Sequence, residues 1–239
     1  FSQHAMKDDY LFTIGYEDNG NTVKNGKSLY FKGEKWSYHS NGNGKIRVLL
    51  PKNQAFPDAV RILALLYNEF YKREDDSFIL HAAGLQKYGK GFIFTGESGA
   101  GKTTISKLSL PEAEVLSDES IILSKDCEGY WISQCPIKTE ITKLNDKKVK
   151  LCAIFSLVKD TTNSLKKLSG AEIARKLMDE ILYVNLSESV TWVNVLEEKL
   201  KFISAVCDHV PVYELRFRKD NSFWEEIERA GVFETADSI

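Results

Sequence analysis

One stretch of the chain has the residue types and the spacing of a phosphate-binding loop. Gly96-Glu-Ser-Gly-Ala-Gly-Lys-Thr103 matches the pattern G-x-x-x-x-G-K-[ST] at every position. In such a loop, glycines let successive backbone N–H groups point at one phosphate, and the next helix adds positive potential from its N-terminus. Lys102 would supply a charge to the β- and γ-phosphates, and Thr103 would offer a hydroxyl to Mg²⁺. The predicted ligands are ATP and Mg²⁺, held by Gly96, Glu97, Ser98, Gly99, Ala100, Gly101, Lys102, Thr103 and Thr104.

The neighbouring sequence supports this interpretation. The apolar run Phe92–Thr95 predicts a strand before the loop, and a short helix is expected over about residues 102–108, before Pro111. A glycine-rich strand-to-helix turn that binds nothing is the competing interpretation. Such a turn would not require Lys102 and Thr103, so the pattern favours nucleotide binding. It leaves open what happens to the γ-phosphate.

An acidic pair follows the loop at a short distance. Asp118-Glu119 comes directly after a predicted strand over residues 114–117 and lies 16 residues beyond Lys102. Most GTPases and motor ATPases place their magnesium-organising Asp much further along the chain. The short return is typical of a compact kinase-like site, in which one carboxylate organises Mg²⁺ and the other accepts a hydroxyl proton. A solvent-facing acidic turn is the alternative.

A histidine is also expected near the loop. His81 lies 15 residues before Gly96, and a hairpin through Gln86–Lys90 would bring it to the loop end of the sheet. A lone histidine beside an apolar run is more often a hydrogen-bonded structural residue than a catalyst. Spacing alone therefore leaves the role of His81 open.

Taken together, these motifs resemble the HPr kinase/phosphorylase family and its looser relatives, which share a nucleotide fold with phosphoenolpyruvate carboxykinase. The resemblance extends over about residues 78–217 and is sharpest over 78–123. The residues that carry it are His81-Ala-Ala-Gly84, Gly96–Thr104, Leu116-Ser-Asp-Glu119, Pro136-Ile-Lys138 and Val210–Phe217.

The resemblance implies ATP-dependent phosphorylation of a serine hydroxyl on a small protein or peptide. Asp118 corresponds to the carboxylate that removes the hydroxyl proton, His81 to an active-site histidine, and Glu119 to an Asp near the metal. The implied catalytic residues are thus Asp118, His81 and Lys102, and the implied metal ligands are Thr103 and Glu119. Lys138 is a further residue that could reach the transferred phosphate.

The sequence also departs from that family. Thr104 replaces a Glu, Glu119 replaces an Asp, and the arginine-bearing motif of the reverse phosphorylase activity has no counterpart. These departures leave open whether the chain has that activity and whether HPr is its substrate. Divergent relatives resemble tailoring kinases that act on ribosomally made peptides. A small-molecule kinase and a non-catalytic, nucleotide-responsive binding module remain the alternatives.

The elements predict an α/β fold, a P-loop kinase domain of the HPr kinase C-terminal type, with an N-terminal β-rich layer. Residues 1–55 read as an antiparallel meander and 56–239 as the kinase domain, or the whole chain as one continuous domain. The expected strands are Tyr10–Tyr16, Ser28–Tyr38, Lys45–Leu50, Phe78–Leu85, Gly91–Thr95, Glu114–Ser117, Ala153–Val158 and Pro211–Phe217, and the expected helices are 57–73, 171–183, 191–206 and 222–229. Two of these helices begin with the spacing of a capping box, at Ser169 and Glu172 and at Ser222 and Glu225. The helix 191–206 has an apolar stripe formed by Val193, Leu196, Leu200 and Ile203.

The composition and charge limit the classes of partner that we expect for this chain. Lys and Arg number 32 against 34 Asp and Glu, a formal charge of −2, which gives no basic footprint for nucleic acid. No apolar run reaches the roughly 18 residues that a membrane span needs. The four cysteines form no CxxC pair and read as reduced thiols, so a cytoplasmic protein is expected. The resemblance also implies a homo-oligomer as one expectation.

Overall fold

A computed structural model describes residues 11–16, 27–31, 34–40, 45–50, 76–135, 147–182 and 192–234. The chain divides into two units. The first comprises Phe1–Tyr67 and Tyr183–Asn194, and the second comprises Asn68–Leu182 and Val195–Ile239. The helix expected over 57–73 and the residue Lys138 lie outside the described residues.

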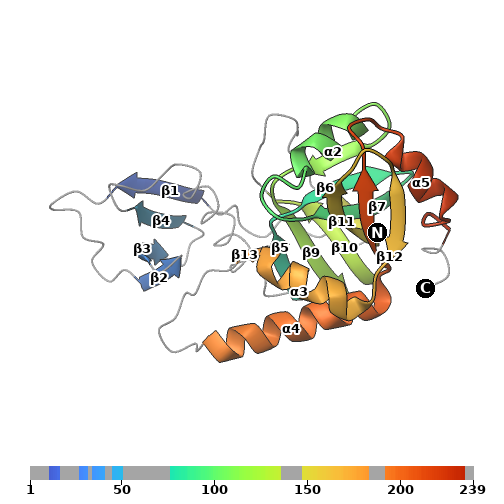
Figure 1. Cartoon of the computed structure of the whole chain (residues 1–239). Helices are drawn as coiled ribbons and strands as arrows, with labels where there is room; N and C mark the ends of the chain where they lie inside the picture. Colours follow the sequence, from blue (N-terminus) through green and yellow to red (C-terminus); the bar gives the residue numbers. More distant parts are fainter. Residues whose placement is uncertain are drawn as a thin grey trace, which may run out of the picture. The chain divides into compact units, whose positions relative to one another are not determined.

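The first unit contains a four-stranded sheet with the order β1-β4-β3-β2 (Figure 1). Its strands are β1 (Leu11–Tyr16), β2 (Lys27–Phe31), β3 (Glu34–Ser40) and β4 (Lys45–Leu50). The predicted strand 28–38 is thus two strands. The predicted meander is wrong in one pairing, because β1 joins β4 in parallel. Turn signals indicate which neighbours form hairpins, but they do not indicate which edge the first strand joins.

The second unit is a mixed α/β structure built on a ten-stranded sheet, β13-β5-β9-β10-β11-β7-β6-β8, with β14 paired to β11 and β12 paired to β14. Most pairings are antiparallel, but β11 runs parallel to both β7 and β14. The strands are β5 (Asp76–Leu80), β6 (Ala83–Lys87), β7 (Lys90–Thr95), β8 (Glu114–Ser117), β9 (Ile121–Asp126), β10 (Gly129–Gln134), β11 (Lys148–Lys159), β12 (Ser164–Lys167), β13 (Ile181–Leu182) and β14 (Val212–Phe217).

The run Phe78–Leu85, predicted as one strand, is interrupted at His81. β5 pairs with β9 and β13, whereas β6 pairs with β7 and β8. Both halves are buried, so the hydrophobic pattern continues through the change of partner and conceals it. The predicted hairpin from β6 to β7 is confirmed, with Tyr88 and Gly89 both at positive φ, as a two-residue turn favours.

The described helices cover both faces of the sheet (Figure 1). α2 (Lys102–Ser109) and α5 (Phe223–Arg229) lie on one face, and α3 (Gly170–Glu180) and α4 (Trp192–His209) lie on the other. Within the described ranges, no helix has both the length and the apolar character needed to cross a lipid bilayer.

Capping signals in the sequence predicted the start of one of these helices correctly and the start of another wrongly. The capping box of Ser169 and Glu172 at the start of α3 is confirmed. The box predicted for Ser222 and Glu225 is wrong, because Ser222 makes no side-chain cap and instead donates its hydroxyl to Asp220.

The apolar stripe predicted on α4 is also wrong in part. Leu196 and Leu200 are 58% and 50% exposed, whereas Phe202, Ile203 and Val206 are buried. Apolar residues lie on more than one side of this helix, so spacing alone did not identify the face that packs.

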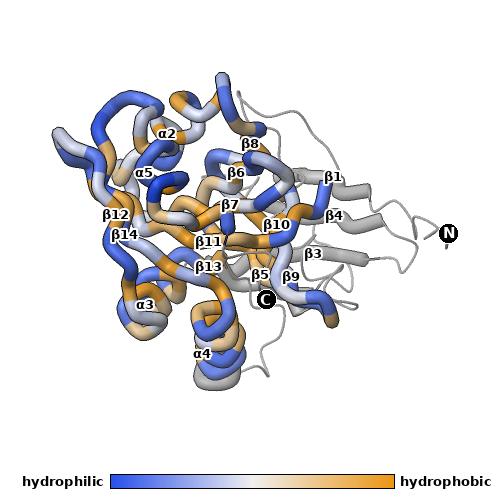
Figure 2. The backbone as a smooth tube through the Cα atoms, turned by 90° about the vertical axis from the view of Figure 1, so that its right-hand side faces the viewer, coloured by the Kyte–Doolittle hydropathy of each residue, from blue (hydrophilic) through white to orange (hydrophobic). Residues whose placement is uncertain are grey.

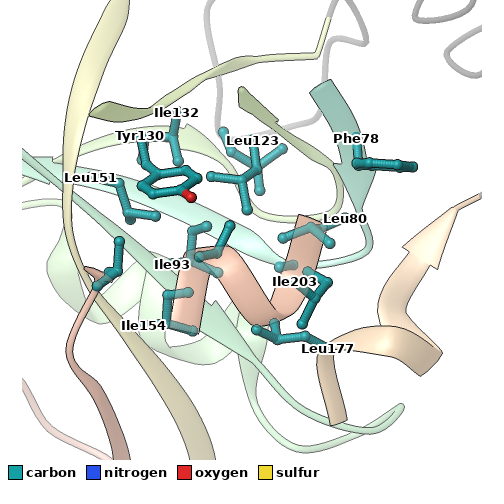
Figure 3. Close-up of a cluster of buried hydrophobic side chains, with 14 of the residues drawn as sticks. Phe78, Leu80, Ile93, Leu123, Tyr130, Ile132, Leu151, Ile154, Leu177 and Ile203 are labelled. Atoms are coloured by element: carbon teal, nitrogen blue, oxygen red, sulfur yellow. The ribbon is translucent and has the colours of Figure 1, made fainter. Parts of the chain in front are cut away.

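Two hydrophobic clusters hold these layers together. Figure 2, coloured by hydropathy, shows segments rich in apolar residues running between the two helical layers. On the α3 and α4 side, Leu177 and Ile203 join Leu80 and Ile93, as drawn in Figure 3. On the other side, Ile105 of α2 belongs to a cluster rich in aromatic rings. Because successive residues of β7 serve opposite clusters, this strand is buried on both faces and fixes the position of the loop that follows it.

A charged contact fastens the β9–β10 turn to β11. Asp126 accepts hydrogen bonds from the Glu128 amide, the Trp131 indole and the Lys148 ammonium at 2.9, 2.7 and 2.8 Å. Mainly because of Lys148, the pKa of Asp126 is lowered from 3.8 to about 2. A carboxyl group with a lowered folded pKa stabilises the fold above its unfolded pKa, and this contribution is lost as the pH falls through the folded value.

Replacing this carboxylate tests the contact. We expect Asp126→Asn to lower the melting temperature at pH 7, with a difference that shrinks as the pH falls from about 4 to about 2. Glu128→Gln is the matched control, because it removes an exposed carboxylate from the same turn. Thermal unfolding followed by circular dichroism across this pH range measures both. A difference for Asp126→Asn that does not depend on pH would contradict the prediction.

Candidate functional site

The strand directions bring the candidate residues to one edge of the sheet. β7 is parallel to β11 and β14, and it is parallel to β8 because both run antiparallel to β6 between them. The carboxyl ends of these four strands therefore meet at one edge, where ligands bind in open α/β sheets. The residues that follow the four strands are Gly96, Asp118, Asp160 and Arg218, and His81 lies just before the start of β6.

A cavity of about 280 Å³ opens at this edge. Eight of the predicted residues line it, together with Lys159, which was not predicted. Gly96, Glu97 and Ala100 belong to the loop but do not line the cavity, and neither does Asp118. The lining residues are His81, Ser98, Gly99, Gly101, Lys102, Thr103, Thr104, Glu119 and Lys159.

Hydrogen bonds within the loop hold its curvature. The Ala100 amide donates to the Glu97 carbonyl at 2.9 Å, and the Ile105 amide donates to the Gly101 carbonyl at 2.8 Å at the start of α2. The Lys102 ammonium donates to the Gly96 carbonyl at 2.6 Å, and the residue is only 7% exposed. The charge of Lys102 is therefore held against the loop, at the wall of the cavity.

Gly101 is a loop position that cannot accept a side chain without strain. Its φ is +114°, and a Cβ there would lie 2.7 Å from Cζ of the buried Phe217 ring. Gly89, in the β6–β7 turn, also has a positive φ of +75° but has no atom within 4 Å of its Cβ position. The two glycines thus separate backbone strain from steric overlap.

We expect Gly101→Ala to lower the free energy of unfolding by about 2–4 kcal/mol, since overpacking adds to the cost of the backbone conformation. Gly89→Ala, which has the backbone cost alone, should lose only about 1–2 kcal/mol. Urea unfolding measures both variants. Equal losses would show that Phe217 does not constrain the loop.

His81 is held between two carboxylates. Its Nε2 lies 3.5 Å from Glu119 Oε1, and its Nδ1 lies 3.0 Å from Glu180 Oε2. The His81 amide also donates to the Glu180 carbonyl at 2.8 Å, so the end of α3 fixes this residue through backbone and side chain. Hydrogen bonding to Glu119, and then to Glu180, raises the pKa of His81, against burial and the charge of Lys102. The site therefore favours the imidazolium beside the cavity.

The two members of the acidic pair face different surroundings. Glu119 lines the cavity and contacts His81. Asp118 is only 8% exposed, and its buried Oδ1 has no hydrogen-bond partner among the described residues. A buried carboxylate oxygen without a protein partner is uncommon in folded proteins.

The comparison with known families gives a description for most of the chain. Residues 49–234 match the model of the family described as "SynChlorMet cassette protein ScmC". The chain belongs to the ScmC family. The match spans the glycine-rich loop, His81, the acidic pair and Glu180. No match to the chain was found among the curated proteins.

Membership of the ScmC family corrects the resemblance drawn from the sequence. The chain was expected to be a divergent relative of HPr kinase/phosphorylase, and the matching model is that of ScmC instead. Short motifs such as the phosphate loop recur in many families, because the same backbone geometry suits any phosphate ligand. They are therefore weak evidence of the family to which a chain belongs.

Two residues at the site of this ScmC family member were not predicted from the sequence. Glu180 is 99 positions from His81, and only the docking of α3 on the sheet brings them together. Lys159 ends β11, and its place in the cavity follows from the parallel pairing of β11 with β7. The predicted strand 153–158 ended one residue too early to draw attention to Lys159. Recognising that two parallel strands share an edge would have identified it.

Proposed function

We propose that this protein is an ATP-dependent phosphotransferase that moves the γ-phosphate to a hydroxyl group. The supporting observation is a single cavity that joins the glycine-rich loop to a histidine and an acidic residue from other elements. A loop that only bound phosphate would not need His81 and Glu119 opposite Lys102. This arrangement supports a P-loop kinase type of site, in which positioning and electrostatics supply most of the rate.

The residues present suit a magnesium-bound nucleotide. The Thr103 hydroxyl and the Glu119 carboxylate line the same cavity, and oxygen atoms are the ligands that Mg²⁺ prefers. The described residues hold no cluster of three His, Cys, Asp or Glu side chains, so these two would be joined by phosphate oxygens and water. When bound, the metal neutralises negative charge on the phosphates. Loop amides and Lys102 would hold the phosphates in position.

The transfer step assigns a role to Asp118. The acceptor oxygen attacks the γ-phosphorus, the bond to the β–γ bridging oxygen breaks, and ADP leaves with that electron pair. The hydroxyl proton passes to Asp118, whose side chain must turn toward the acceptor when the substrates bind, because it does not line the cavity in this structure. Its buried and unpartnered Oδ1 favours this role, because Glu119 already contacts His81. Glu119 and Glu180 hold His81 in place, and His81 forms part of the cavity wall next to the acceptor.

The proposed acceptor is a serine on a small protein or a ribosomally made peptide. The family description refers to a cassette, so the products of neighbouring genes are the first acceptors to test. Each candidate would be incubated with the protein, Mg²⁺ and γ-labelled ATP, and phosphorylated residues mapped by mass spectrometry. We expect labelled serine with the wild-type chain and none with Lys102→Ala.

Two other outcomes would change the proposal. Label that enters a metabolite of a cell extract, and no peptide or protein, would make the acceptor a small molecule. Tight ATP binding without any transfer would contradict a kinase and favour a nucleotide-responsive binding module. A separate measurement on the purified protein, size-exclusion chromatography with light scattering, would report whether a homo-oligomer forms.

A further inference from the structure

We propose that Lys159, the last residue of β11, is a second phosphate-binding cation of this site. The inference rests on the proposed function, since it assigns the residue that completes the phosphate cradle. Lys159 lines the same cavity as Lys102 but comes from the neighbouring parallel strand. No sequence motif includes it.

The stem of Lys159 lies against the loop. A Cβ placed on Gly101 would be 3.6 Å from Lys159 Cε, so the end of the side chain rests beside the residue that precedes α2. The ring of Phe217, from β14, would also contact a Cβ placed on Gly101. The ends of β11 and β14 thus support the loop from outside, and the lysine brings its ammonium to the point where phosphates would meet the loop.

The acidic residues of β14 and of the loops that follow β11 and β14 are paired with arginines. Arg216 binds Asp160 at 3.2 Å and Glu214 at 3.1 Å, and Arg218 binds Asp220 at 2.5 Å. Within the described part of the chain, the side chain of Lys159 makes no ion pair or hydrogen bond. Its charge is therefore available to an anionic ligand, although three carboxylates lie on the adjoining strand ends and loop.

The two lysines of the cavity differ in a way that suits different tasks. Lys102 is nearly buried and bound to the Gly96 carbonyl, which fixes its ammonium at the wall. Lys159 is exposed and has no partner to hold it, so it can follow the charge of a phosphate. Phosphotransferases commonly use a second cation to stabilise charge that develops on the transferred phosphoryl group. Here the chain supplies that cation from its own sheet.

Binding of inorganic tripolyphosphate, measured by isothermal titration calorimetry, tests the assignment without requiring catalysis. We expect Lys159→Gln to weaken this binding about tenfold, the effect of losing one hydrogen bond to a charged group. Lys159→Arg should keep most of the affinity, because the positive charge remains. Lys107→Gln is the control, since it removes an exposed lysine from α2 outside the cavity. Circular dichroism would verify that each variant is folded.

The outcomes separate this inference from the kinase proposal. Tripolyphosphate binding that depends on Lys159, in a protein that transfers no phosphate from ATP, supports Lys159 and refutes the kinase. ATP turnover and tripolyphosphate binding that are both unchanged in Lys159→Gln overturn the role of Lys159 and leave the kinase standing. A wild-type chain that binds no tripolyphosphate overturns the role of Lys159, and the transfer assay with labelled ATP then decides the kinase proposal by itself.

Discussion

Replacing Lys102 with alanine is expected to reduce ATP turnover by at least about a hundredfold, the usual effect of removing one fixed group that stabilises transition-state charge. The reason lies in its placement. The ammonium is held by the Gly96 carbonyl at the wall of the cavity, so it meets the phosphates without rearrangement. Affinity for ATP should fall as well, because the same charge binds the ground-state phosphates.

The matched control for this variant is Lys107→Ala, an exposed lysine five positions along the same helix. Turnover measured with labelled ATP should be unchanged there. Lys102→Ala loses one hydrogen bond to the loop, which costs only about 1 kcal/mol, so both variants should stay folded. Equal turnover by Lys102→Ala and the wild-type chain would remove the loop from the proposed mechanism.

The loop and its neighbouring elements were predictable because they depend on local sequence. The pattern from Gly96 to Thr103, the hairpin before it and the capping box at Ser169 each involve residues a few positions apart. Glycine conformation, helix capping and apolar periodicity act over such distances. The coarse fold class, a mixed α/β structure, follows from the same signals.

What the sequence could not predict depends on long-range pairing. The change of partner at His81 occurs inside one apolar run, so no local pattern marks it. The parallel pairing of β1 with β4 and the face on which α4 packs are likewise decided by contacts between distant segments. Propensity and periodicity are weak guides there, because tertiary packing overrides them.

The residues of the candidate site divide in the same way, into those predicted from local sequence and those placed by pairing between distant segments. Lys102 and Thr103 come from one motif, whereas Glu180 and Lys159 enter the site only through sheet order and the docking of α3. The acidic pair lies between these cases. Its position after a strand predicted that it would reach the edge of the sheet, but not that Glu119 would line the cavity while Asp118 is buried beside it.

This difference within the acidic pair leads to the second large effect. We expect Asp118→Asn to lower phosphate transfer by about 10²–10⁴-fold, the usual contribution of a positioned general base. ATP binding should remain, because Asp118 does not line the cavity that would hold the phosphates. Asparagine has the shape of aspartate but cannot take a proton from the acceptor hydroxyl.

Glu119→Gln serves as the comparison, since it is the adjacent carboxylate and contacts His81. Loss of its charge should weaken the hold on His81 and on a bound metal, so both the apparent affinity for Mg²⁺ and the rate should fall. Asp118→Asn should leave the Mg²⁺ dependence unchanged and affect the rate alone. Transfer assays at several Mg²⁺ concentrations separate the two carboxylates. Full transfer by Asp118→Asn, with none by Glu119→Gln at saturating Mg²⁺, would move the role of proton acceptor to Glu119, the residue that already faces the cavity.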